Sequence, residues 1–235
     1  MIFRVSTYVI LIKFININLK DFMNEFDLKA AGWDQNPIVW DRAEAIANEI
    51  NRLIPLNKQM TALEFGAGTG VTSFILKDSL KEITLMDNSS EMVKMMDNKI
   101  KISGVRNLKT LNFNLERSDL KDTKFDFIFN QMVLHHIDDV EKIIKKFHNL
   151  INPGGYLAIA DLYAEDGSFH GEGFTGHNGF DIEKLSASIK KQGFTGTSHR
   201  KCFTINKKIS ETDTKPFDVF MIIAKRPLYY YHRFS

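Results

Sequence analysis

A glycine turn directly after a short apolar run constrains this chain more than any other feature. Residues 61–70 read Thr-Ala-Leu-Glu-Phe-Gly-Ala-Gly-Thr-Gly, and Ala62, Leu63 and Phe65 predict a buried strand. Glycines let the backbone turn sharply and approach a ligand where a Cβ atom would collide. The segment therefore predicts a strand, then a ligand-binding turn, then a helix.

The spacing of these glycines discriminates between nucleotide-type ligands. A dinucleotide fingerprint requires G-x-G-x-x-G, but the third glycine here is Gly70 and the dinucleotide position holds Val71. Glu64, just ahead of the turn, would repel a pyrophosphate and suits a ligand that carries a positive ammonium or sulfonium group. The pattern is E-x-G-x-G-x-G, and it disfavours a nicotinamide dinucleotide.

The turn and three later segments together resemble one enzyme family. The later segments are residues 83–87, which end in an acid 21 positions after Gly66, residues 125–139, and residues 150–159. In this order they are similar to the motifs of the class I S-adenosylmethionine-dependent methyltransferases. The resemblance covers roughly residues 30–225 and is nearest to the small-molecule branch that includes the quinone-biosynthesis methyltransferases.

The resemblance implies an α/β fold with a Rossmann-like, doubly wound, seven-stranded and mostly parallel sheet that has helices on both faces. In the family the seventh strand is antiparallel, between the fifth and the sixth. The alternation of apolar patterns agrees with one such domain, because strand and helix patterns follow each other without a repeat or linker. Helices are predicted over 40–53, 69–76, 90–100, 139–150 and 181–192, and the last strands over 195–204 and 217–224.

The family's cofactor is S-adenosyl-L-methionine, which the resemblance places over the carboxyl ends of the first two strands. Asp87 matches the acid that holds the ribose hydroxyls. Asn114 stands where the family often has an acid near the adenine, and its amide oxygen can accept the same hydrogen bond. The predicted cofactor-binding residues are Glu64, Gly66, Ala67, Gly68, Thr69, Gly70, Asp87, Asn88, Met92, Asn114, Leu115, Asn130, Gln131 and Met132.

Histidines supply the candidates for a general base. A sulfonium already makes its methyl group reactive, so orientation matters most, and a base is needed only for a protonated acceptor or a carbon acid. His170 and His177 lie in residues 164–180, a loop rich in glycine, aromatic and acidic residues, and His135 follows the fourth predicted strand. For His135 and its neighbour His136, the alternative is a structural role under the loop.

No metal site is predicted. Glu165 and Asp166 precede the two loop histidines, but the spacing of these four residues matches no zinc signature. The single cysteine, Cys202, allows no intrachain disulfide, and a reducing, cytoplasmic location is the expectation.

Net charge argues against a nucleic-acid partner. The whole chain carries a formal charge of +2, but residues 1–22 and residues 226–235 each contribute +2, so residues 23–225 carry −2. A mildly acidic domain lacks the basic surface with which proteins bind double-stranded nucleic acids. No Asn-Pro-Pro-Tyr-type tetrad follows the fourth strand either, so the expected partner is a small organic molecule, methylated at oxygen, carbon or nitrogen.

Both ends of the chain are predicted to lie outside the domain at residues 23–225. Residues 1–22 read as an extension, and only eight residues separate Arg4 from Lys13, too few to cross a bilayer. Residues 226–235 read as a tail. We therefore expect no membrane association, and a monomer or a homodimer.

Two other classes of function stay open from the residues alone. One is a nicotinamide-dependent oxidoreductase on a similar open sheet, which Glu64 and Val71 disfavour. The other is a non-catalytic module that binds S-adenosylmethionine without transferring its methyl group.

Overall fold

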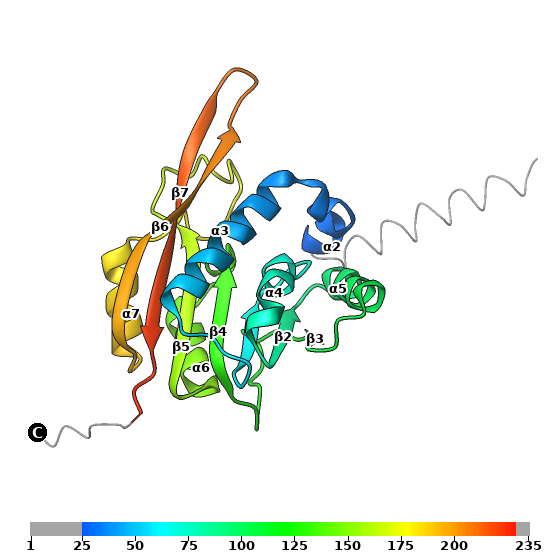
Figure 1. Ribbon diagram of the computed structural model, residues 1–235. Coiled ribbons are helices and arrows are strands. Elements are labelled where there is room, and N and C mark those ends of the chain that lie inside the picture. The colour runs from blue at the N-terminus through cyan, green and yellow to red at the C-terminus, as the bar shows by residue number, and fades with distance from the viewer. Residues whose placement is uncertain (1–24, 229–235) are drawn as a thin grey trace, which may run out of the picture.

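A computed structural model describes residues 25–228 (Figure 1), so the predicted extension at 1–22 and residues 229–235 of the predicted tail lie outside the described residues. The elements follow in the order α2 (Glu25–Lys29), η1 (Ala30–Gln35), α3 (Pro37–Leu53), β1 (Thr61–Phe65), α4 (Val71–Leu76), η2 (Lys77–Ser79), β2 (Glu82–Asp87), α5 (Ser90–Ser103), β3 (Leu108–Asn112), β4 (Phe125–Gln131), η3 (Leu134–His136), α6 (Val140–Leu150), β5 (Ile151–Leu162), α7 (Ile182–Lys191), β6 (Thr195–Lys208) and β7 (Thr214–Lys225).

The strands form one seven-stranded sheet in the order β3-β2-β1-β4-β5-β7-β6. Strands β1 to β5 pair in parallel, whereas β7 is antiparallel to both β5 and β6. The predicted fold class is therefore confirmed, including the antiparallel strand between the fifth and sixth. Strand order reverses at β1, where β2 lies on one side and β4 on the other, which is the switch point of a doubly wound sheet.

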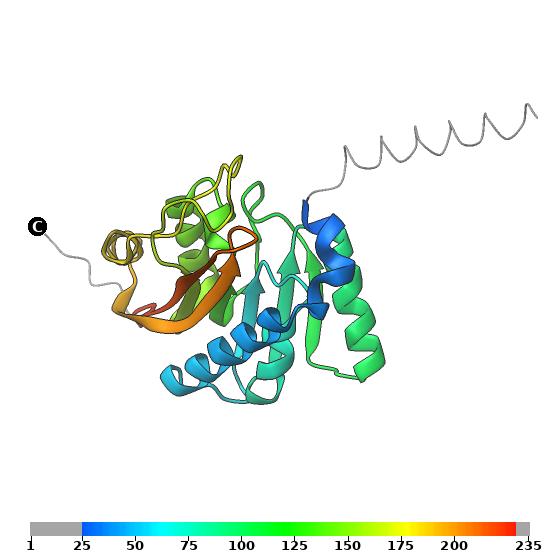
Figure 2. The same ribbon diagram turned by 90° about the horizontal axis from the view of Figure 1, so that it is seen from above.

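Helices cover both faces of the sheet, α3, α4 and α5 on one face and α6 and α7 on the other (Figures 1 and 2). Side chains along each strand point alternately to the two faces of the sheet, so each strand contributes to two hydrophobic cores. Phe127 and Phe129 of β4 belong to the core that includes Ile46 of α3. Ile128 belongs to the core that includes Phe147 of α6. Because parallel strands are buried on both faces, residues 127–129 in the middle of β4 are all apolar.

Local sequence sets the ends of the helices, and several of the predicted ends shift by one to three residues. Ser89 caps α5 by accepting a hydrogen bond from the Met92 N–H at 3.1 Å, and Gly104 ends this helix in the left-handed conformation. Helix α4 begins at Val71, two residues later than predicted. Thr69 does not cap it, because its hydroxyl donates to Asp34 of η1 instead.

The carboxyl ends of the parallel strands form the edge on which the site lies. Helix α2 lies over this edge and the hairpin of β6 and β7 extends past it (Figure 1). At the opposite edge Arg226, predicted to begin the tail, still belongs to the domain, since its N–H donates to the Gly155 carbonyl at 2.9 Å. Among residues 25–228, no helix has the length and apolar character needed to span a bilayer.

Candidate active site

A cavity of about 440 Å³ opens at the carboxyl ends of β1, β2 and β4, and most of the predicted cofactor-binding residues line it. Those that line it are Gly66, Ala67, Gly68, Thr69, Asp87, Asn88, Met92, Asn114, Leu115, Gln131 and Met132. These residues come from four separate segments of the chain. The parallel register brings them to one place because each segment follows the end of a strand.

The glycine turn has a backbone that only glycine adopts readily. Gly66, Gly68 and Gly70 have φ values of +67°, +57° and +78°. A Cβ atom on Gly66 would lie 2.5 Å from a methyl group of Val133, and one on Gly70 would lie 2.5 Å from Leu85. At Gly68 the nearest heavy atom would be 3.8 Å away, so this glycine borders open cavity.

Asp87 ties the end of β2 to the glycine turn. One carboxylate oxygen accepts the Gly68 N–H at 2.7 Å and the other accepts the Ser89 N–H at 2.9 Å. Burial raises the pKa of this carboxyl, and the hydrogen bonds from the Ser89 and Gly68 N–H groups oppose that rise. Each oxygen keeps a further lone pair that can accept a ligand hydroxyl from the cavity. Asp87 therefore shapes the turn as well as lining the cavity.

Four predicted site residues do not line the cavity. Gly70 is the N-cap residue directly before α4 and packs on the core. Asn130 is buried, and neither of its side-chain polar atoms is hydrogen bonded among the described residues. His177 donates from its Nε2 atom to the Ile137 carbonyl, 2.9 Å away, so its ring holds the loop in place and does not line the cavity. The fourth is Glu64.

Glu64 lies beneath the glycine turn, fully buried, where the Ser73 hydroxyl of α4 donates to one of its oxygens. Its other oxygen has no partner among the described residues. Burial raises the pKa of Glu64 to about 8, and the hydrogen bond from Ser73 only partly offsets this. At neutral pH the buried carboxyl is mainly protonated, so it does not present a negative charge to the cavity as the sequence suggested.

The raised pKa of Glu64 makes stability depend on pH. A carboxyl whose folded-state pKa lies above its unfolded value stabilises the fold fully below the unfolded pKa, and this contribution is lost as pH rises through the folded value of about 8. We expect the free energy of unfolding, measured in urea, to fall between pH 5 and pH 9. Glu64→Gln should flatten this fall, whereas Glu211→Gln, at an exposed position, should leave it unchanged. Parallel pH profiles of wild type and Glu64→Gln would contradict the assignment.

Sequence reasoning missed the cavity wall that the N-terminal helices supply. Phe26 and Lys29 of α2 and Trp33 of η1 line the cavity, and Asp34 binds both Thr69 and, at 2.7 Å, the ammonium group of Lys99. These residues precede the first strand and belong to no motif. Only their contacts across the sheet edge reveal them.

Arg42 is a second residue that sequence reasoning missed. It lies on α3, lines the cavity, and places its Nε 3.4 Å from Oε1 of Gln131. Burial lowers the pKa of Arg42 to about 10, so it remains a cation at neutral pH. A partly buried guanidinium in a cavity is suited to bind a carboxylate.

Three histidines meet at the far wall of the cavity. The rings of His135, His136 and His170 lie with centroids 4.2 to 5.4 Å apart, and all three line the cavity. Burial, and to a smaller extent the neighbouring histidines, lowers the pKa of both His136 and His170 to about 4. Both rings are therefore neutral at physiological pH.

His135 is held by an acid that no motif identified. Its Nδ1 lies 2.6 Å from Oδ1 of Asp161, and its backbone N–H donates to the other oxygen of Asp161 at 3.2 Å. Asp161 lies near the end of β5 and is fully buried. This bond sets the orientation of the ring and leaves Nε2 as the free nitrogen.

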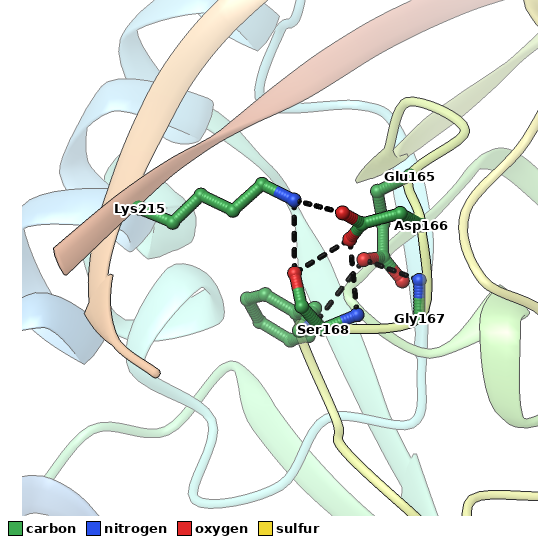
Figure 3. Close-up of polar contacts among 6 residues, drawn as sticks. Glu165, Asp166, Gly167, Ser168 and Lys215 are labelled. Atoms are coloured by element: carbon green, nitrogen blue, oxygen red, sulfur yellow. Dashed lines mark hydrogen bonds and ion pairs between the residues drawn. The ribbon is translucent and has the colours of Figure 1, made fainter. Parts of the chain in front are cut away.

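The loop that carries His170 is anchored at its start by its own acids and by β7. Glu165 accepts the N–H groups of Gly167 and Phe169, at 2.9 and 3.1 Å. Lys215 reaches from β7 to Asp166 at 2.6 Å and to Ser168 at 2.9 Å (Figure 3). Glu165 and Asp166 are thus engaged in hydrogen bonds within the loop and to β7.

Comparison with known proteins identifies this architecture. Residues 63–159 match the family described as "Methyltransferase domain", from β1 through most of β5. Residues 63–159 form a methyltransferase domain. The match includes the glycine turn, Asp87, Gln131 and His135, and the predicted family is confirmed.

Curated relatives and solved structures agree on this domain. An uncharacterised methyltransferase of Schizosaccharomyces pombe is 30% identical over 142 residues, 54% of this chain and 50% of that protein. A demethylmenaquinone methyltransferase of Geobacillus kaustophilus is 26% identical over 46% of this chain and 47% of its own length. This chain therefore spans about half the length of these two relatives.

A crystal structure of a SAM-dependent methyltransferase from Aquifex aeolicus has the same fold. It superposes with a TM-score of 0.62 at 20% identity, covering 85% of this chain and 98% of that chain.

Proposed function

We propose that this protein transfers the methyl group of S-adenosylmethionine to a small organic acceptor. The observation that carries the proposal is the cavity in which the turn of Gly66, Gly68 and Thr69 faces Asp87 across the switch point of the sheet. The methyltransferase domain of residues 63–159 supports the same reaction.

The residues of the cavity fit the parts of this cofactor. Gly68 leaves a space that any side chain would fill, and Asp87 has lone pairs free for ribose hydroxyls. Met92, Phe113 and Leu115 offer an apolar wall for an adenine ring, beside the amide of Asn114. Arg42 offers a cation for the carboxylate of the methionine portion.

When bound, the cofactor supplies a methyl group on a positively charged sulfur, which is already reactive toward a nucleophile. The residues of this chain then have to orient the acceptor and exclude water. The N-terminal helices, through Phe26 and Trp33, cover the cavity on one side, and His135, His136 and His170 form the wall left for the acceptor. A small acceptor suits the dimensions of the cavity. Monomeric or dimeric assembly and a cytoplasmic location are part of the proposal.

We expect S-adenosylmethionine and S-adenosylhomocysteine to raise the melting temperature of the purified protein, and NAD to leave it unchanged. A ligand at ~100 times its dissociation constant stabilises the fold by about 2.7 kcal/mol. Stabilisation by NAD, with no effect of either adenosyl compound, would favour the oxidoreductase alternative.

Turnover is tested separately, because binding alone also fits a non-catalytic module. A panel of hydroxyl, thiol, amine and carbon-acid acceptors is incubated with S-adenosylmethionine, and the formation of S-adenosylhomocysteine is measured. Formation with at least one acceptor supports the proposal. Cofactor binding without turnover of any acceptor class would favour the non-catalytic module.

A further inference from the structure

The cluster of His135, His136 and His170 has the geometry of a metal-binding site. One nitrogen of each ring lies within 4.8 Å of the corresponding nitrogens of the other two. A tetrahedral zinc ion, with Zn–N distances of about 2.0–2.1 Å, holds its ligand nitrogens about 3.3 Å apart. Small rotations of the rings toward one another close this difference. The cluster was not foreseen from sequence, because His170 is remote from the other two along the chain.

Two further features distinguish the cluster from aromatic packing alone. Nε2 of His170 is buried and has no hydrogen-bond partner among residues 25–228, which is costly for a polar atom that binds nothing. Asp161 accepts a hydrogen bond from Nδ1 of His135 at 2.6 Å. Histidines that bind metals usually donate their other ring N–H to a carboxylate or carbonyl in this way, which fixes the orientation of the ring. Aromatic packing also holds the cluster in place, since the ring of His170 stacks on that of Phe174 with the two centroids 3.8 Å apart.

We propose that His135, His136 and His170 bind one divalent transition metal ion of the zinc class, with an open coordination position that faces the cavity. Three imidazoles and a free fourth position are the ligand set of catalytic rather than structural zinc. Acidic and basic groups both surround the cluster: the carboxyls of Asp161 and Glu25 oppose the ammonium group of Lys207, which lies 4.6 Å from the centroid of the Phe169 ring. Lys29, the nearest ammonium group on α2, is paired with Glu25 at 2.8 Å, and both line the same cavity.

The use of this ion rests on the proposed function, although the metal site itself does not. An open position on zinc binds an electron-pair donor and lowers the pKa of a bound hydroxyl or thiol. The acceptor class is then an oxygen or sulfur nucleophile. Its proton passes to water on binding, the new oxygen–carbon or sulfur–carbon bond forms as the sulfonium–carbon bond breaks, and S-adenosylhomocysteine leaves as a neutral thioether.

Metal binding is tested without cofactor or acceptor. The untagged protein is treated with a chelator, and Zn²⁺ affinity is then measured by competition with a chromophoric chelator. Wild type should bind one Zn²⁺ per chain, and Co²⁺ should give the visible absorption of a site with histidine ligands. Absence of tight Zn²⁺ binding, or a Co²⁺ spectrum without nitrogen ligands, would overturn the proposal.

Three variants locate the ion. His170→Phe keeps the ring that stacks on Phe174 but removes both nitrogens, and should weaken Zn²⁺ binding by more than about 100-fold. Asp161→Asn should weaken it by roughly 10- to 100-fold. His199→Ala, on β6 beside Glu183 and outside the cavity, is the control and should bind as wild type does. Equal affinity of wild type and His170→Phe places any bound ion elsewhere and overturns the proposal.

The outcomes for the metal and for the methyl transfer are separable. If Zn²⁺ does not bind but S-adenosylhomocysteine does, the metal site fails and the proposed function stands. If Zn²⁺ binds at the histidines and no adenosyl compound binds, the metal site stands and the proposed function fails.

Discussion

Replacing Gly68 with valine is expected to abolish binding of S-adenosylhomocysteine while the chain remains folded. The φ angle of +57° puts a branched residue in the left-handed region, which costs roughly 1–2 kcal/mol. An added Cβ atom meets no protein atom closer than 3.8 Å, so the side chain enters the cavity and occupies the space proposed for the cofactor. Calorimetric titration should show a loss of affinity of at least about 100-fold, or about 2.8 kcal/mol.

Gly104→Val is the matched control for the cost of backbone strain. Gly104 ends α5 with a φ of +65°, has no neighbour within 4 Å of an added Cβ atom, and does not line the cavity. Both variants should lose a similar amount of unfolding free energy in urea. Only Gly68→Val should lose ligand affinity. If Gly68→Val binds S-adenosylhomocysteine as tightly as wild type does, the cofactor site does not lie at the glycine turn.

Replacing Asp87 with alanine is expected to weaken both cofactor binding and the fold. Two backbone N–H groups, from Gly68 and Ser89, lose their acceptor, and each buried group left without a partner costs roughly 1–3 kcal/mol. Ribose hydroxyls would lose the same acceptor, so affinity for S-adenosylhomocysteine should fall by roughly 5- to 150-fold. The two backbone hydrogen bonds therefore give Asp87 a part in stability as well as in affinity.

Asp97→Ala is the control for this variant. Asp97 lies on α5 and accepts a hydrogen bond from the Thr110 hydroxyl at 2.6 Å on the exposed surface. Its loss should change unfolding in urea only slightly and leave affinity unchanged. If Asp87→Ala unfolds like wild type and keeps its affinity, this carboxylate has no part in the turn or in the site.

The motif predicted the glycine turn correctly, but it did not predict the burial of Glu64. The turn was recognised from sequence because positive φ values and close approach require glycine wherever they occur. The charge of Glu64 was read as facing the ligand, yet the residue is buried below the turn and its pKa is raised to about 8. Residue type determines whether a group can ionise, but burial determines whether it does.

The sequence by itself determined the fold class, the family and the position of most of the cofactor cavity. Strand and helix periods are local properties, and in a parallel sheet the residues after each strand come to one edge whatever the details of packing. Gly66, Gly68, Asp87 and Met132 could therefore be predicted to meet, and all four line the cavity.

Only the tertiary structure decided the rest of the site, because it depends on contacts between segments that no local pattern relates. Trp33 and Arg42 reach the cavity from helices that precede the first strand. Asp161, an unremarkable residue within an apolar strand, becomes the partner of His135 through the geometry of the strand end. His170 and His177 looked alike in sequence, yet the fold of their loop turns the first toward the cavity and leaves the second bonded to a backbone carbonyl.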